Sequence, residues 1–307
     1  MSSLGLCGAA PLNQGAGEPV VLLHSSGGSG AQWRSLTERL LPHRHVVAPD
    51  LYGYGVTPAW AGRGVFSLAH EAALVETVLD DLGEPVHLVG HSYGGAVALH
   101  MALANPHRLR SLSLIEPVAF HLLRHGDAAD WAALQEILAV ARHVTAAVAA
   151  GDLAAGCERF VDYWTGPGAW AALPVPKRDA LAPRLSKVAL DFQATLNAAA
   201  RIEDVPAIGV PTLLLQGGRT ATPTRRICRL LAEALPDARL HVIAGAGHML
   251  PLTHRDEVHG LVIAHLDVNS DPERRGTCRP CQPTAAASAM PSASRTPSAS
   301  VGTSTAM

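Results

Sequence analysis

Short apolar runs alternate with longer helix-like segments along most of the sequence, and this alternation constrains the fold more than any other feature. Each run lacks a polar face, which is typical of strands buried on both sides of a parallel sheet. The order strand, helix, strand predicts an α/β fold with a doubly wound, mostly parallel sheet. The predicted strands are Val20–His24, Val46–Pro49, Val86–Gly90, Leu112–Ile115, Thr212–Gln216 and Leu240–Ile243, and the predicted helices lie near 31–41, 68–82, 96–104, 225–235 and 255–266.

Two segments interrupt this alternation and define the expected domains. Residues 118–205 contain only helix-like pieces broken by Gly and Pro, which predicts a helical insertion packed over the sheet. Residues 269–307 consist largely of Ser, Thr, Ala and Pro, a composition that buries too little apolar surface to fold. We therefore expect one core formed by 1–117 and 206–268, a helical cap over 118–205 and a disordered tail over 269–307.

Composition argues against several kinds of partner. The 24 basic and 26 acidic residues leave a net charge of -2, which does not favour nucleic acid. The five cysteines are an odd number and are scattered, which favours a reducing compartment over a disulfide framework. No signal peptide and no apolar run of about 18 residues is evident, so we expect a cytoplasmic protein without a membrane partner. The oligomeric state is left open.

The segment Gly90–Gly95 (GHSYGG) carries the most specific chemical signal. It follows an apolar strand and precedes a helix-like run, so Ser92 is predicted to lie in a sharp strand-to-helix turn. Side chains at positions 90 and 94 would collide with neighbouring backbone in such a turn, which explains the glycines. The turn exposes the Ser92 hydroxyl beside a helix N-terminus, and this predicts a nucleophile.

A serine hydroxyl is a weak nucleophile unless a base accepts its proton. His248 follows the last predicted strand in a Gly-rich turn, Ala244–Met249, that can bring an imidazole back to Ser92. We therefore predict that His248 is the base. The sequence has sixteen histidines, but their spacing gives no convincing set of metal ligands, so neither a metal nor another cofactor is expected.

With these motifs in place, residues 18–267 resemble a capped member of the α/β-hydrolase superfamily. The resemblance extends to an oxyanion loop at His24–Gly28 and to a post-strand turn at Asp50–Gly55. It implies that the cap lies between the sixth and seventh strands of the family core, and that the family's first two strands are reduced or missing here. A rival dinucleotide-binding reading of Gly28-Ser29-Gly30 with Asp50 is weaker, because Trp33 occupies the third glycine position.

The sequence departs from the family pattern at the acid. The loop after Thr212–Gln216 usually carries an aspartate, and here it reads Gly217–Thr220. Glu116 ends the preceding core strand, which is the position of the acid in some family members, such as haloalkane dehalogenases. The resemblance therefore implies that Glu116 orients His248, with a loop cap or a rim charge as the plainer reading. An acid from the cap, Glu203 or Asp204, is a further alternative.

The resemblance also implies an oxyanion hole and a set of substrate contacts. The expected oxyanion donors are the backbone N–H of Tyr93 and that of Ser26, with Ser25 as an alternative because it replaces the usual glycine. The expected substrate contacts are His24, His91, Phe120 and Trp164.

The predicted cap is rich in aromatic residues. It holds seven of the thirteen in the chain, which are Phe120, Trp131, Phe160, Tyr163, Trp164, Trp170 and Phe192. An aromatic lining suggests an apolar or aromatic substrate, whereas a small core inside the cap is the plainer explanation, and both readings stay open.

These features lead to several hypotheses about function. The first is a cofactor-independent serine hydrolase that acts on a small-molecule acyl substrate, an ester, thioester or related compound with an apolar or aromatic group. C–C bond hydrolysis, perhydrolysis and lyase chemistry use the same residues and are alternatives. A non-catalytic ligand-binding protein with the same fold is a further alternative, because the usual aspartate is missing. An aspartate at position 92 would favour alkyl-enzyme chemistry, and Ser92 argues against it.

Overall fold

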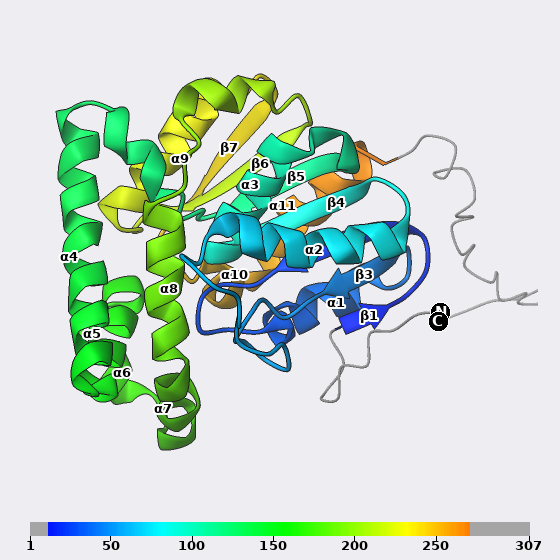
Figure 1. The fold of residues 1–307 in the computed structure, drawn as a ribbon. Helices are drawn as coiled ribbons and strands as arrows, with labels where there is room; N and C mark the ends of the chain where they lie inside the picture. Colours follow the sequence, from blue (N-terminus) through cyan, green and yellow to red (C-terminus); the bar gives the residue numbers. More distant parts are fainter. Residues whose placement is uncertain (1–11, 271–307) are drawn as a thin grey trace, which may run out of the picture. The chain divides into compact units, whose positions relative to one another are not determined.

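The computed structural model describes residues 12–270, which form one compact unit (Figure 1). Seven strands form one sheet in the order β1-β3-β2-β4-β5-β6-β7, in which β1 runs antiparallel to β3 and all other neighbours are parallel. The strands are β1 (Leu12–Gln14), β2 (Glu18–Leu23), β3 (Arg44–Ala48), β4 (Val86–His91), β5 (Leu109–Ile115), β6 (Thr212–Gly217) and β7 (Ala238–Ile243). The predicted α/β class and mostly parallel sheet are therefore confirmed.

Alternate residues of the strands divide between two apolar layers. Val20 and Leu22 of β2 belong to a cluster with α1 and α11, whereas Val21 and Leu23 belong to a larger cluster with α2 and α3. Both faces of the sheet are thus covered, which explains why the strands read as continuous apolar runs. The helices outside the insertion are α1 (Arg34–Leu40), α2 (Leu68–Leu82), α3 (Tyr93–Ala104), α9 (Thr222–Ala234), α10 (Leu250–Thr253) and α11 (Arg255–Val268), with short 3₁₀ turns η1 (Gly30–Trp33) and η2 (Pro106–Arg108).

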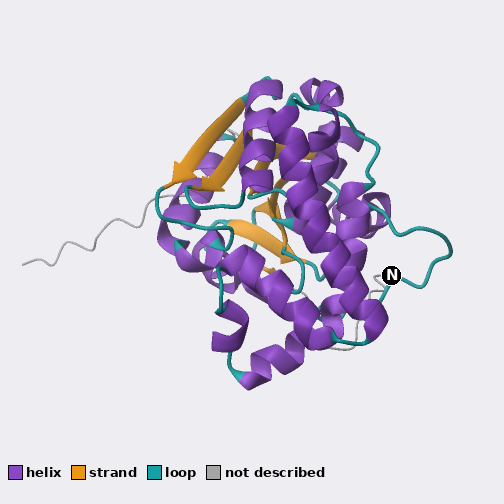
Figure 2. Cartoon of the chain, turned by 90° about the vertical axis from the view of Figure 1, so that its left-hand side faces the viewer, coloured by secondary structure: helices purple, strands orange, loops and turns teal. Residues whose placement is uncertain are grey.

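A helical insertion separates β5 from β6, as expected. Two of its helices, α4 and α8, pack against each other beside the sheet (Figure 1), and Figure 2 shows the insertion from its own side, in front of the strands. The exact limits of this cap, 118 and 205, remain a prediction. It contains α4 (Ala128–Ala150), α5 (Leu153–Thr165), α6 (Ala169–Ala172), α7 (Val175–Leu181) and α8 (Leu185–Leu196), with 3₁₀ turns η3 (Phe120–His125), η4 (Ala182–Arg184) and η5 (Ile202–Ala207).

The helix α4 corrects one sequence expectation. Its length and composition would allow it to cross a membrane, although we expected no such run. In the structure α4 packs against α5, α8 and α9, and Ile137 and Val140 on its inner face are fully buried. A helix of a folded core passes the same test of length and composition, so this property is weak evidence for a membrane.

At the N-terminal end of the described chain one short strand, β1, precedes β2, which agrees with the expectation that the first strands are reduced. At the other end the predicted disordered tail begins too early, because Asn269 bonds the carbonyl of His265 (2.8 Å) and Ser270 is buried, where its Oγ accepts a hydrogen bond from Arg44 (2.7 Å). The remainder of that prediction, 271–307, lies outside the described residues.

Candidate active site

The candidate site lies where the strand order reverses. β2 and β4 are neighbours in the sheet, and the chain proceeds from β2 to β3 in one direction and from β4 to β7 in the other. Ligands of open α/β sheets bind at such a switch point, outside the carboxyl ends of the strands. The loop after β2 carries Ser25 and Ser26, and the turn after β4 carries Ser92, so both meet there.

Ser92 occupies a strained turn between β4 and α3. Its φ of 56° and ψ of -115° are rare for a residue with a side chain. A Cβ at position 90 would lie 2.3 Å from the Gly94 carbonyl oxygen, and one at position 94 would lie 2.4 Å from that of Leu23. The predicted steric need for glycine at both positions is confirmed.

His248 lies between Ser92 and Glu116. Its Nε2 is 2.8 Å from Ser92 Oγ, and its Nδ1 is 2.9 Å from Glu116 Oε2. Because a carboxylate accepts hydrogen bonds, Nδ1–H donates to Glu116, and Nε2 is left to accept the Ser92 hydroxyl proton. The loop between β7 and α10 brings the imidazole to this position, where it is 3% exposed.

Glu116 is held by donors from the loop that lacks the usual aspartate. Its Oε1 accepts the backbone N–H of Gly217 at 2.6 Å, and its Oε2 accepts the hydroxyl of Thr220. Glu116 is fully buried and has a φ of 50°. Between residues 12 and 270, Ser92 and Glu116 are the two non-glycine residues with a positive φ. The loop after β6 therefore positions the carboxylate instead of supplying it.

The two alternative acids from the cap lie elsewhere. Asp204 accepts the backbone N–H of Arg201 at 2.8 Å and so caps the short η5 turn, and Glu203 is exposed. Among the candidate acids, Glu116 is therefore the one that the fold brings to His248.

The three oxyanion candidates differ in what their N–H groups do. The Ser25 N–H donates to Gln32 Oε1 at 3.2 Å, so it is already used. Within residues 12–270 no hydrogen bond is recorded for the N–H of Ser26 or of Tyr93, the first residue of α3. Those two donors are thus available to a ligand beside Ser92.

His24 and His91 are fully buried behind the site and line neither cavity beside Ser92, contrary to the expected substrate contacts. Burial lowers the pKa of His24 to about 4 and that of His91 to about 3, so both are neutral near pH 7. His24 Nδ1 donates to the Ser25 carbonyl (2.8 Å), and His91 Nε2 donates to the His248 carbonyl (3.0 Å). Both therefore hold loops of the site.

Gln32, which belongs to no recognisable sequence motif, joins these loops. Its Nε2 lies 3.1 Å from His91 Nδ1, and its Oε1 accepts the Ser25 hydroxyl at 2.8 Å. A continuous chain of hydrogen bonds thus runs from the carbonyl of His248 to Ser25. The contact forms because the fold brings residues 32 and 91 together, and no local sequence pattern predicts it.

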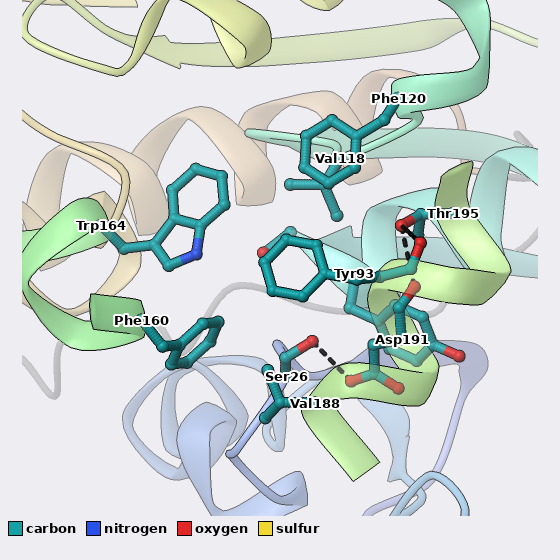
Figure 3. Close-up of a pocket in the computed structure, with 11 residues that line it drawn as sticks. Ser26, Tyr93, Val118, Phe120, Phe160, Trp164, Val188, Asp191 and Thr195 are labelled. Atoms are coloured by element: carbon teal, nitrogen blue, oxygen red, sulfur yellow. Dashed lines mark hydrogen bonds between the residues drawn. The ribbon is translucent and has the colours of Figure 1, made fainter. Parts of the chain in front are cut away.

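Phe120 and Trp164 do line the space beside Ser92 (Figure 3). Trp164 also stacks on the His248 ring, with 4.0 Å between the ring centroids. Phe160 and Phe192 complete an aromatic wall, and Phe120, Trp164 and Phe192 belong to the hydrophobic core as well. Trp170 is buried in the same core and lines neither cavity, and Trp131 is exposed. The aromatic wall is thus part of the core, and the apolar or aromatic substrate remains a prediction.

A buried cluster of charges forms another part of the wall. Asp191 of α8 accepts hydrogen bonds from the hydroxyls of Ser26 (2.6 Å) and Tyr54 (2.5 Å), and it pairs with Lys187. Lys187 also pairs with Glu71 of α2 at 2.9 Å. Burial raises the pKa of both carboxyl groups, and Lys187 opposes that shift.

This cluster is not evident from the sequence. Lys187 and Asp191 are spaced i, i+4, which is typical of an exposed ion pair on a helix. The one available signal was that Val188 and Phe192, their neighbours in sequence, are apolar.

The alternatives of a metal site and a dinucleotide site gain no support from residues 12–270. Within residues 12–270, no group of three or more His, Cys, Asp or Glu residues lies in an arrangement that could hold a metal ion. Asp50, weighed as a ribose ligand, instead accepts the backbone N–H groups of Gly30 (2.7 Å) and Val56 (2.9 Å) and so holds its own turn.

Comparison with known proteins supports the same fold. Residues 18–255 match the family model described as the alpha/beta hydrolase fold. The chain is 30% identical over 264 residues to a lipase of Mycobacterium tuberculosis, and the aligned region covers 80% of this chain and 92% of the lipase. It is also 30% identical over 268 residues to a 2-hydroxymuconate semialdehyde hydrolase of a Pseudomonas species, and the aligned region covers 81% of this chain and 87% of that hydrolase.

Solved structures show the same architecture. The esterase from Exiguobacterium antarcticum superposes with a TM-score of 0.66 at 20% identity, over 83% of this chain and 94% of that one. A hydrolase from Pseudomonas aeruginosa has a TM-score of 0.63 at 26% identity, over 82% and 92% of the two chains.

Proposed function

Because this chain belongs to the α/β-hydrolase fold family, we propose that it is a cofactor-independent serine hydrolase that cleaves esters or thioesters. The observation that carries the proposal is the chain of contacts from Ser92 Oγ to His248 Nε2 (2.8 Å) and from His248 Nδ1 to Glu116 (2.9 Å). The geometry matches a nucleophile, a base and a carboxylate that holds the base.

In the proposed reaction, Ser92 Oγ attacks the carbonyl carbon while His248 takes its proton. Negative charge develops on the carbonyl oxygen, and the free N–H groups of Tyr93 and Ser26 stabilise it. His248 then gives the proton to the leaving group, and an acyl-enzyme remains. Water, activated by the same imidazole, releases the acid and restores Ser92.

Glu116 supports this cycle by its charge and its fixed position. The imidazolium that forms twice in each turnover lies beside a fully buried carboxylate. The non-catalytic alternative arose from the missing aspartate after β6. Because Glu116 supplies a carboxylate to the same imidazole, the hydrolase is the better-supported reading.

C–C bond hydrolysis is the second candidate function. It is favoured by the likeness to the 2-hydroxymuconate semialdehyde hydrolase over most of both chains. In that chemistry Ser92 and His248 keep their roles, and the leaving group is a stabilised carbanion that takes a proton at carbon. Turnover of a vinylogous 1,5-diketo acid to two carboxylic acids, with no turnover of aryl esters, would favour this candidate.

Removal of the nucleophile tests the proposal. We expect Ser92→Ala to lower kcat on p-nitrophenyl acetate by about 10⁴ to 10⁶-fold, because no other group replaces the attacking oxygen. A fluorophosphonate probe should label the wild type once, at Ser92, and leave this variant unlabelled. Ser186→Ala, at an exposed position of α8, serves as the control and should behave like the wild type. Retention of activity by Ser92→Ala would falsify the mechanism.

A further inference from the structure

Two cavities of very different size meet at Ser92. The inner cavity has a volume of about 20 Å³ and lies between the sheet and α8, where Val118, Phe120, Val188 and Phe192 form its apolar wall (Figure 3). The outer cavity has a volume of about 440 Å³ and extends over the loop after β2. A substrate cleaved at Ser92 must place one of its two halves in each.

The position of His248 decides which half lies where. His248 lines the outer cavity and does not line the inner one. The imidazole must donate its proton to the leaving group, so the leaving atom has to lie within hydrogen-bond reach of Nε2, on the outer side. The inner cavity therefore remains for the substituent on the carbonyl carbon, which is the acyl chain.

The inner cavity is small and its wall is stiff. A volume of about 20 Å³ accommodates roughly one water molecule or methyl group. The Phe120 ring stacks on Phe192 and on Trp164, with centroids 6.2 Å and 6.4 Å apart, and Val188, another residue of the wall, is fully buried. Such packed side chains resist displacement, so a longer acyl chain meets a steric cost.

The two cavities also differ in charge. Asp191, the charged residue that lines the inner cavity, is already paired with Lys187, and the described lining of this cavity contains no Lys, Arg or His to bind a carboxylate on the acyl chain. The charged side chains that line the outer cavity are Lys177 and Arg184, and its described lining contains no Asp or Glu. Arg184 is held over the loop by a hydrogen bond to the Gly27 carbonyl (2.9 Å). The outer side therefore favours an anionic group.

Resting on the hydrolase function proposed above, we propose that the substrate joins a short acyl group, of about acetyl size, to a larger anionic leaving group. Ser92 Oγ forms a bond to the acyl carbon, the bond to the leaving group breaks, and His248 protonates the departing atom. Water then adds to the acyl-enzyme, so that each turnover consumes one water and releases a short carboxylic acid and the protonated leaving group.

An acyl series tests the inner cavity. With p-nitrophenyl acetate, butyrate and hexanoate, we expect kcat/KM to fall by at least about 10-fold from acetate to butyrate, since each methylene that does not fit costs about that factor. Val188→Ala enlarges the inner cavity and should reduce this ratio several-fold. Val161→Ala removes the same two methyl groups from the outer cavity and should leave the ratio unchanged.

Two acetate esters that differ in the charge of the leaving group test the outer cavity. We expect 4-acetoxybenzoate to have a KM at least about 5-fold lower than the neutral 4-acetoxybenzamide. Lys177→Gln should remove most of this preference by raising KM for 4-acetoxybenzoate. Arg63→Gln, an exposed cation outside both cavities, is the control and should retain the preference.

The outcomes separate this inference from the proposed function. If the fluorophosphonate labels Ser92 and acetate esters turn over, but hexanoate is cleaved as fast as acetate, the assignment of the cavities is wrong while the hydrolase stands. Equal KM values for the anionic and neutral acetates would likewise overturn the anionic leaving group. If Ser92 is neither labelled nor required, the hydrolase itself fails.

Discussion

At the scale of single residues, Glu116 at the end of β5 supplies the carboxylate that family members usually carry in the loop after β6. Gly217 and Thr220 donate to Glu116 from the loop where the family usually carries its acid. The carboxylate therefore comes from β5 and its orientation from the loop after β6. Two donors in addition to His248 fix the carboxylate, so it keeps its charge directed at the imidazole.

This arrangement predicts unequal effects for two substitutions. Glu116→Gln keeps the shape of the side chain but removes the charge that stabilises the imidazolium, so we expect kcat to fall by about 10³ to 10⁴-fold. Thr220→Val removes one donor to that carboxylate and should cost about 10-fold. The measurements are kcat on p-nitrophenyl acetate and Tm for each variant. Equal losses for both would show that the charge of Glu116 has no special role.

At the scale of elements, the turn between β4 and α3 depends on close backbone approach. A methyl group at Gly94 would meet the carbonyl oxygens of Leu23 and His24 at 2.4 Å and 2.6 Å. Both oxygens belong to β2 and its loop, and the Gly94 N–H donates to the His24 carbonyl at 3.1 Å. The nucleophile turn and the oxyanion loop are thus packed directly on each other.

Two glycine substitutions test this packing. Gly94→Ala should lower the free energy of unfolding by about 1–3 kcal/mol, because backbone has to move to admit the methyl group. Gly260→Ala, in an open and exposed part of α11, should raise it by about 0.5–1 kcal/mol through helix propensity. Urea unfolding of both variants measures the difference. A stabilising Gly94→Ala would refute the close approach.

The elements were predicted from sequence where one local pattern sets them. All six apolar runs became strands with bounds shifted by a few residues, because burial on both faces leaves a clear signature. The strand Leu12–Gln14 was missed, since its three residues are mainly polar and exposed. Its existence depends on pairing with β3, which no local pattern reveals.

The residues of the candidate site likewise fall into those that a local motif predicts and those that only the fold brings together. Ser92 and His248 lie in local motifs that sequence reading can identify. Asp191 meets Ser26 across 165 positions, and Gln32 meets His91 across 59. Such contacts follow from how the cap and the loops pack, so spacing along the chain does not predict them. The burial of His24 and His91 was missed for the same reason.

At the scale of the whole molecule, buried histidines make stability depend on pH. Burial lowers the pKa of His24, His87 and His121 to about 4 and that of His91 to about 3. In the unfolded chain histidine titrates near 6.5, so between about pH 4 and 6.5 the unfolded state binds more protons than the native state. The stability from these neutral histidines is thus complete above about pH 6.5 and is lost as the pH falls.

We therefore expect the free energy of unfolding to decrease from pH 7 to pH 5, by up to about 1.4 kcal/mol per pH unit for each of these histidines. His91→Gln should reduce the slope of the free energy of unfolding against pH by about 1.4 kcal/mol per pH unit, because one proton fewer is taken up on unfolding. Leu88→Ala, a fully buried apolar control, should lower stability equally at each pH. Urea titrations at pH 7, 6 and 5 give the slopes, and an unchanged slope in His91→Gln would contradict the prediction.

The contacts of His248 have a consequence for the order of folding. It meets Glu116 across 132 residues and Ser92 across 156, with the whole cap lying between the partners in sequence. Contacts between such distant residues form late, after the loss of chain entropy that precedes them. During refolding, helical circular dichroism should therefore recover before Ser92 regains its reactivity toward a fluorophosphonate, and a partly synthesised chain that ends before β7 would carry an inert serine.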